Sequence, residues 1–360
     1  MEGHPADGVL HAWHEIADRG WDTLLVGNGL SINISPEFAY ESLYAEAEKA
    51  PENGPLDKRD LMVFERFGTS NFEVALGKLR DAITMAEVLD QPSLTYRRRF
   101  TSVQAALGAT IRGVHLKRSE VPDSTLATIK DELRGYKAIF STSYDLILYW
   151  ATGHDEDFAA FRDCFWGPDN SFDSGNCQIW GGNTATYFLH GALHLIVDGE
   201  GRTRKLTGTD QTLLEQFGKP IPSDPEARPL LITEGSARDK LRAIEGNDYL
   251  SHAYEELKER SGALLVFGHS LGEQDRHLID AINSNPDRPV AISMVREDGE
   301  HLRERQSEIW GRLRTKAEDV CFFDAETHPL GSRDLRGTVP WKGFRPRASR
   351  IGRPPTRERA

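Results

Sequence analysis

The chain has 360 residues, of which 38% are hydrophobic and 28% charged; this is ordinary for a globular protein and longer than one hydrophobic core usually supports. No run approaches 18 consecutive apolar residues and residues 1–7 show no secretion signal, so we expect no membrane span and place the protein in the cytoplasm. The net charge of −12 is uneven, because residues 333–360 carry about +7 and the body about −19. An acidic body should not bind nucleic acid.

Cysteine content and the basic C-terminus set two further expectations. Cys164, Cys177 and Cys321 include no C-x-x-C pair, so we expect neither a disulfide framework nor a four-thiolate zinc site, and we assign no metal. The tail at 331–360 has little apolar surface to bury and is predicted to be disordered. A basic docking arm for an acidic partner is the alternative for this tail.

Seven short apolar runs, bounded by Gly, Asp or Pro, predict strands at 22–27, 137–142, 184–189, 228–234, 263–268, 288–295 and 320–324. Most are separated by helical patterns, which is typical of a parallel sheet with crossover helices. We therefore predict an α/β fold. Its doubly wound, mostly parallel, Rossmann-like sheet would occupy 21–330, after an N-terminal helix or arm at 1–20.

Three segments of this domain are predicted to depart from simple alternation of strands and helices. About 110 residues between the first two strands show helical spacing and predict a helical insertion at about 36–135. Residues 151–182 are rich in Asp, Gly and aromatic residues without periodicity, and we interpret them as a small irregular lid. Residues 193–206 predict a hairpin that turns at Asp198-Gly199-Glu200-Gly201.

The first strand ends in Gly27-Asn28-Gly29-Leu30-Ser31. Two glycines let backbone N–H groups approach an anion, and Ser31 or Ser35 would cap a following helix near Pro36. The third glycine of G-x-G-x-x-G is missing, because residue 32 is Ile, and no strand ending in an acid follows about 20 residues later. An ordinary NAD dehydrogenase is therefore disfavoured.

Two more strands end in polar loops, Ser141-Thr142-Ser143-Tyr144-Asp145 and His190-Gly191. Asp145 is alternatively an N-cap of the helix that follows it. His190 titrates near neutrality in water, which suits a general base, and Gly191 would let a ligand come close. The carboxyl ends of parallel strands meet at one sheet edge, where ligands bind in such folds.

The segment Gly268-His269-Ser270-Leu271-Gly272 follows the strand at 263–268 and matches the nucleophile elbow G-x-S-x-G. It supports a rival hypothesis, an α/β serine hydrolase that uses Ser270 with Asp298 and His328 as acid and base. This hypothesis leaves the first half of the chain without a role. A further segment, Ile232–Lys240, offers Glu234 and Lys240 either to a cofactor pocket or to an exposed salt bridge at a helix start.

The order of these loops resembles that of the sirtuin-like NAD-consuming family, in particular a bacterial branch of it. The family's second loop reads Thr-Gln-Asn-Ile-Asp or Thr-Thr-Asn-Tyr-Asp, so this chain has Ser143 where the family has its catalytic Asn. Sirtuin protein deacylases typically carry a four-cysteine zinc module, and its absence here argues against acyl-lysine removal.

The resemblance implies specific roles. His190 would be the base on ribose, position 143 would orient ribose or water, and Asp145 would contact the nicotinamide carboxamide. The implied contacts to NAD, as substrate or ligand, come from residues that lie in the four loops: Gly27, Asn28, Gly29, Ser31, Thr142, Gly191, Gly268, Ser270 and Asp275. His277 would lie on the helix after Asp275.

The resemblance also implies a reaction and partners. The first hypothesis is hydrolysis of NAD to nicotinamide and ADP-ribose. Related bacterial proteins imply a role in defence against phage by depletion of cellular NAD. A homo-oligomer or a partner protein of a defence system would activate it. A non-catalytic sensor of NAD or ADP-ribose is a further alternative, because a hydroxyl at Ser143 lacks the paired donor and acceptor of an amide.

Overall fold

The computed structural model describes the following residues: 5–48, 55–154, 160–166, 169–177, 184–207, 213–214, 224, 226–232 and 236–336. They form two compact units, each treated separately below. The first comprises 1–36, 115–232 and 236–338, and the second is built around 37–114.

A seven-stranded sheet forms the centre of the first unit. Its strands are β1 (Thr23–Val26), β2 (Ala138–Ser141), β3 (Phe161–Arg162), β4 (Thr184–Phe188), β8 (Leu264–Phe267), β9 (Val290–Met294) and β10 (Val320–Asp324). Their order is β10-β9-β8-β1-β2-β4-β3, and every neighbouring pair is parallel. The sheet is flanked by helices, which confirms the predicted doubly wound α/β fold.

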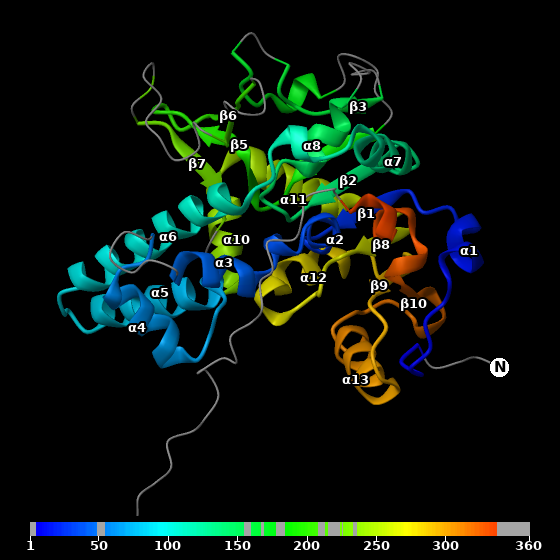
Figure 1. The fold of residues 1–360 in the computed structure, drawn as a ribbon, viewed down its shortest axis with the longest axis horizontal. Coiled ribbons are helices and arrows are strands. Elements are labelled where there is room, and N and C mark those ends of the chain that lie inside the picture. Colours follow the sequence, from blue (N-terminus) through cyan, green and yellow to red (C-terminus); the bar gives the residue numbers. More distant parts are fainter. Residues whose placement is uncertain are drawn as a thin grey trace, which may run out of the picture. The chain divides into compact units, whose positions relative to one another are not determined.

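The strand order creates a switch point beside β1, where β8 and β2 pair with opposite edges of the same strand (Figure 1). The chain moves from β1 through β2 to β4 on one side, and later from β8 through β9 to β10 on the other. Loops that leave the carboxyl ends of two such strands diverge and open a crevice. All four residues of β1 are buried, as expected of an apolar strand covered on both faces.

A second, three-stranded sheet is antiparallel, with the order β6-β5-β7. Its strands are β5 (Gly191–Val197), β6 (Thr203–Lys205) and β7 (Arg228–Leu231). The hairpin predicted over 193–206 is confirmed, since Val197 pairs with Thr203 across the turn. The strand predicted at 228–234 belongs to this small sheet and not to the parallel one.

The first unit also contains eight described α-helices. They are α1 (Trp13–Ile16), α2 (Gly29–Ile34), α7 (Asp123–Leu133), α8 (Ile147–Thr152), α10 (Ala237–Glu245), α11 (Asp248–Glu259), α12 (Arg276–Ile282) and α13 (Gly299–Trp310). Single 3-10 turns lie at Ala17–Arg19, Pro36–Phe38, Arg118–Glu120, Ser174–Asn176, Glu273–Asp275, Ala317–Asp319, Ala325–Thr327, Pro329–Gly331 and Arg333–Leu335. α7 lies within the predicted insertion at 36–135 but belongs to the sheet-bearing unit.

The second unit is helical, with α3 (Tyr40–Glu48), α4 (Lys58–Phe67), α5 (Phe72–Val88) and α6 (Leu94–Val114). Asp57 caps α4 by accepting hydrogen bonds from the backbone N–H groups of Arg59 and Asp60. Phe64 and Phe72 pack edge to face with ring centroids 5.0 Å apart, so α4 and α5 share a small aromatic core.

The two ends of the chain differ. In the N-terminal arm, His11 bridges Phe323 of β10 in parallel, which ties the arm to an edge strand. In the tail, residues 337–360 lie outside the described part, so its predicted disorder stays a prediction. Among the described residues, no helix is both long enough and apolar enough to cross a membrane.

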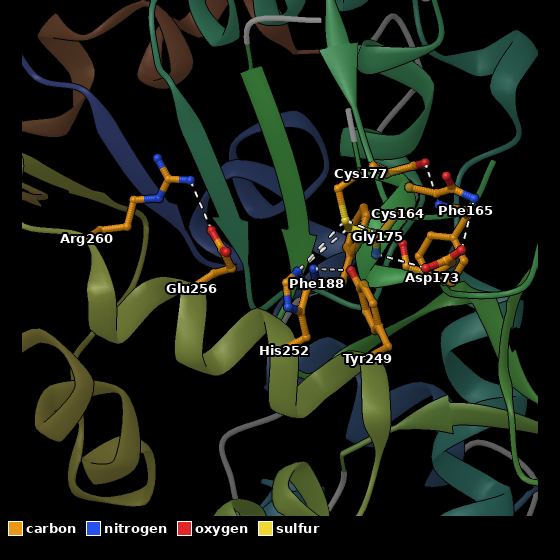
Figure 2. Close-up of a disulfide and its surroundings, with 12 residues drawn as sticks. Cys164, Phe165, Asp173, Gly175, Cys177, Phe188, Tyr249, His252, Glu256 and Arg260 are labelled. Atoms are coloured by element: carbon orange, nitrogen blue, oxygen red, sulfur yellow. Dashed lines mark hydrogen bonds and ion pairs between the residues drawn. A yellow bond between two sulfur atoms is a disulfide. The ribbon is translucent and has the colours of Figure 1, made fainter. Parts of the chain in front are cut away.

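The segment interpreted as an irregular lid contains two ordered features. β3 completes the parallel sheet by pairing with β4. Cys164 and Cys177 form a disulfide, so the expectation of no disulfide was wrong. The two cysteines are 13 residues apart, and only the folded chain brings them together. Figure 2 shows His252 of α11 directed at both sulfur atoms, with Nε2 3.8 Å from Cys164 Sγ and 3.9 Å from Cys177 Sγ.

We expect Cys164→Ser to lower the free energy of unfolding by about 3 kcal/mol in non-reducing buffer, because the crosslink closes a short loop of the unfolded chain. In buffer with a dithiol reductant the variant and the reduced wild type should differ by far less. Urea unfolding under both conditions measures this. Cys321→Ala removes a buried free thiol and serves as control, with an effect that is independent of reductant. Equal effects of Cys164→Ser in both buffers would contradict the prediction.

Candidate functional site at the carboxyl edge of the sheet

Four loops follow β8, β1, β2 and β4 at the carboxyl edge of the sheet, and backbone hydrogen bonds link them in series; we call them the ring of loops. Gly29 N–H donates to Gly268 O at 2.8 Å, which joins the loops after β1 and β8. Thr142 N–H donates to Val26 O at 3.0 Å, and Leu193 N–H donates to Tyr144 O at 2.9 Å. These bonds join the loop after β2 to the end of β1 and to β5, which continues from the loop after β4.

A carboxylate surrounded by hydroxyl groups lies between the first two loops. Asp145 Oδ2 accepts a hydrogen bond from Ser31 Oγ at 2.5 Å and another from Ser143 Oγ. Ser143 Oγ also lies 3.4 Å from Asn28 Oδ1. Ser31, Ser143 and Asp145 are all buried. The structure thus brings together the predicted residues Asn28, Ser31, Ser143 and Asp145.

Two local expectations for these residues are modified. Ser31 is not a helix cap, because α2 already begins at Gly29 and the Ser31 hydroxyl is committed to Asp145. Asp145 bonds the start of the helix that follows it, as its capping alternative predicted, and its contact with a nicotinamide carboxamide stays a prediction. Its Oδ1 accepts the N–H of Ile147 at 2.9 Å at the start of α8, while Oδ2 faces the two serines.

Histidines and a buried ion pair join the remaining loops. His190, which follows β4, has its Nε2 3.0 Å from Nε2 of His277 on α12. Lys240 Nζ donates to Asp275 Oδ1 at 2.8 Å, and His269 Nε2 lies 3.6 Å from Asp275 Oδ2. Lys240 is 1% exposed, so the exposed salt bridge considered for it is excluded. Glu234 lies outside the described residues.

The charges in this histidine cluster follow from burial and from the ion pair. Burial, reinforced by the nearby Lys240 and His269, holds the pKa of His190 well below its usual range. Burial, together with His190, lowers the pKa of His277 to about 2. Burial alone would raise the pKa of Asp275, but His269 and Lys240 outweigh it and the pKa is lowered. His190 and His277 are therefore neutral near pH 7, and one Nε2–H donates to the other ring.

Buried histidines should make the protein sensitive to mild acid. Burial lowers the pKa of each of five: His115, His190, His194, His269 and His277. Below about pH 6.5 the unfolded chain binds more protons than the folded one, so the free energy of unfolding falls. The loss is about 1.4 kcal/mol per pH unit for each histidine. It continues until the folded-state pKa is reached, about 3 for His194.

Urea unfolding between pH 7.5 and 5.5 tests this expectation. His194→Phe removes one of the five histidines. The free energy of unfolding should then fall less steeply with decreasing pH, by the contribution of about one proton. A free energy of unfolding that stays constant from pH 7.5 to 5.5 would contradict the account.

Within the described part of the chain, two groups of side chains have metal-ligand geometry, with ligand atoms within 4.8 Å of one another. His190, Asp275 and His277 form one, but the Lys240 ammonium already neutralises the carboxylate and would repel a cation. Cys164, Cys177 and His252 form the other, which would suit a soft cation such as Zn²⁺ only after reduction of the disulfide.

The predicted glycines serve backbone packing within the protein. A Cβ on Gly29 would lie 2.5 Å from Gly268 Cα, and a Cβ on Gly27 would lie 2.5 Å from Gly268 O. Gly191 has φ +76° and its absent Cβ would collide with Leu230 O, so the glycine allows β5 to approach β7. The expectation that Gly191 lets a ligand come close stays a prediction.

The hydrolase triad is not assembled in the structure. Ser270 is exposed on the loop after β8. His328 is buried, with Nε2 3.3 Å from Glu132 Oε1, and Asp298 caps α13 and lies 2.7 Å from His301 Nδ1. The acid and base expected for Ser270 thus have other partners.

The fold and this site define a doubly wound α/β protein with a polar ring of loops at its switch point. The chain belongs to the family described as "Domain of unknown function (DUF4917)", whose model matches residues 24–330. A search of curated proteins finds no match.

Proposed function

We propose that this protein binds NAD at the ring of loops and hydrolyses it to nicotinamide and ADP-ribose. The observation that carries the proposal is that Ser143 and Asp145, which are hydrogen-bonded to each other, follow β2, while His190 follows the neighbouring strand β4 at the same carboxyl edge of the sheet. These are the positions to which the sirtuin-like resemblance gives the chemistry.

Each side chain has a role in the proposed reaction. The neutral His190 imidazole would accept a proton from a ribose hydroxyl, which requires that the hydroxyl take the place of its His277 partner. Asp145 would accept a hydrogen bond from the nicotinamide amide, in exchange for one of the serine hydroxyls. Ser143 would hold the attacking water. Asn28 lies next to Ser143 and would orient the same water.

The adenosine half of NAD would lie along the loop after β8. Ser270 is exposed there and would bond a ribose or phosphate oxygen. The N–H groups of Gly27 and Gly29 are already donated, to Phe267 O and Gly268 O, so they do not provide the anion contacts first expected of them. Depletion of NAD in defence against phage, and activation by oligomerisation or by a partner, extend this proposal.

Nicotinamide release from NAD, measured by chromatography with the isolated protein and in cell extract, tests the activity. We expect release in at least one of these settings. A fluorophosphonate probe tests the serine hydrolase alternative, and we expect no labelling of Ser270 because its predicted base, His328, is buried and paired with Glu132. NAD binding without release would leave the sensor as the function, and stoichiometric labelling of Ser270 would establish the hydrolase.

A further inference from the structure

A cavity of about 560 Å³ lies outside the ring of loops and shares no residue with it. Six aromatic side chains from α8, β3, β4 and the segment after β3 line it: Tyr149, Trp150, Phe161, Phe165, Trp166 and Phe188. Its volume is in the range of pockets that bind small organic molecules. Flat apolar walls of this kind favour a planar ring.

Three residues that line this cavity carry a buried polar atom with no hydrogen-bond partner among the described residues. These atoms are Trp150 Nε1, Thr186 Oγ1 and His194 Nδ1, on side chains that are 4%, 6% and 1% exposed. Most buried polar groups of native proteins are paired, because an unpaired one opposes folding. Thr184, two residues before Thr186 on β4, follows the rule, since its Oγ1 donates to Tyr136 O at 2.6 Å. Because three such unpaired atoms belong to residues around one cavity, we infer that they are available to form hydrogen bonds with a ligand.

The chemistry of these atoms describes the ligand's polar edge. The indole N–H of Trp150 only donates, whereas the Thr186 hydroxyl donates or accepts. Burial, and to a smaller degree Lys205, lowers the pKa of His194 to about 3, so its ring is neutral and offers one donor and one acceptor. The ring is fixed by stacking on Tyr149, with centroids 4.5 Å apart. A nitrogen heterocycle presents matching donors and acceptors.

Basic side chains make the cavity electropositive. Arg118, Arg162 and Lys205 line it. Arg118 is paired with Asp123 and Lys205 with Asp163, whereas Arg162 forms no ion pair within the described part of the chain. Lys205 Nζ lies 2.7 Å from Asp163 Oδ2 and 5.3 Å from the centre of the Trp166 ring. The net positive charge favours a ligand that carries an anionic group beside its ring.

We propose that this cavity binds a nucleoside monophosphate. Its base would stack on the aromatic wall and bond Trp150, Thr186 and His194, and its phosphate would face the basic side chains. The site is separate from the NAD site proposed above and does not depend on it.

Calorimetric titration of the full chain with adenosine 5′-monophosphate tests the proposal, with Thr186→Val and Thr184→Val as a matched pair. Thr186→Val should weaken binding about 3- to 10-fold, as expected for one lost hydrogen bond. Its melting temperature without ligand should stay equal or rise, because an unpaired buried hydroxyl is removed. Thr184→Val should lower the melting temperature and leave the affinity unchanged. Adenosine should bind more weakly than the monophosphate, with less dependence on salt.

The His190→Ala variant separates the nucleotide cavity from the proposed NAD site. His190→Ala should leave the affinity of the cavity for the monophosphate unchanged. Absence of binding at millimolar concentration would overturn the assignment. Binding that Thr186→Val does not weaken would also overturn it, because the monophosphate would then occupy another site, such as the loop at Ser270.

Discussion

Replacement of His190 by alanine is expected to lower nicotinamide release from NAD by about 10²- to 10⁴-fold, the usual effect of losing a general base. The physical reason is that His190 is buried, neutral and located on the loop after β4, the strand next to β2, from which Ser143 and Asp145 follow. Its pKa lies below the usual range of histidine, so its unprotonated form is available throughout the neutral pH range. Rates of release by wild type and variant give the ratio directly.

His301→Ala is the control for this experiment. His301 is exposed and pairs with Asp298 on α13, so its loss should leave the rate unchanged. His190→Ala also removes the partner of His277, and thermal unfolding must therefore show that the variant is folded. A folded His190→Ala variant with the wild-type rate would remove His190 from the reaction.

The second large effect is expected from Ser143→Asn, which should raise nicotinamide release by about 10²-fold. Ser143 Oγ lies beside Asp145 Oδ2, Asn28 Oδ1 and Ser31 Oγ, so an amide at this position meets both donors and acceptors. An amide supplies a fixed donor and acceptor where the serine hydroxyl supplies one rotating O–H. A single oriented donor at a reacting centre is typically worth about 10²- to 10³-fold in rate.

Ser143→Ala provides the reference for this gain. It removes the hydroxyl at nearly constant volume and should lower the rate below that of wild type. If Ser143→Asn and Ser143→Ala both release nicotinamide at the wild-type rate, position 143 takes no part in the chemistry, and a ligand sensor becomes the better description.

The sequence predicted most of the sheet, because buried parallel strands are short apolar runs with clear ends. It could not predict β3, since Phe161–Arg162 is too short to show a period. The run at 228–234 was recognised as a strand, yet nothing local shows that β7 pairs with β5 in the antiparallel sheet. Pairing partners depend on the whole fold, whereas strand propensity is local.

The candidate site was predictable to the extent that it depends on strand ends. Asp145, Ser143 and His190 follow strands directly, and parallel strands bring such loops together. The ion pair of Lys240 with Asp275 joins residues 35 positions apart, and no local pattern distinguishes it from a surface pair. The disulfide and the unpaired atoms of the aromatic cavity likewise appear only when distant elements meet. The sequence identified Gly27, Gly29 and Gly191 as positions of close approach, but the group that approaches each of them is backbone of the same chain.

The central claim is that the ring of loops binds NAD, and calorimetric titration of the purified full chain with NAD and with ADP-ribose tests it most directly. We predict saturable binding of both ligands that Asp145→Asn weakens for NAD more than for ADP-ribose, because only NAD carries the nicotinamide amide. Absence of binding heat for either ligand at millimolar concentration would contradict the claim.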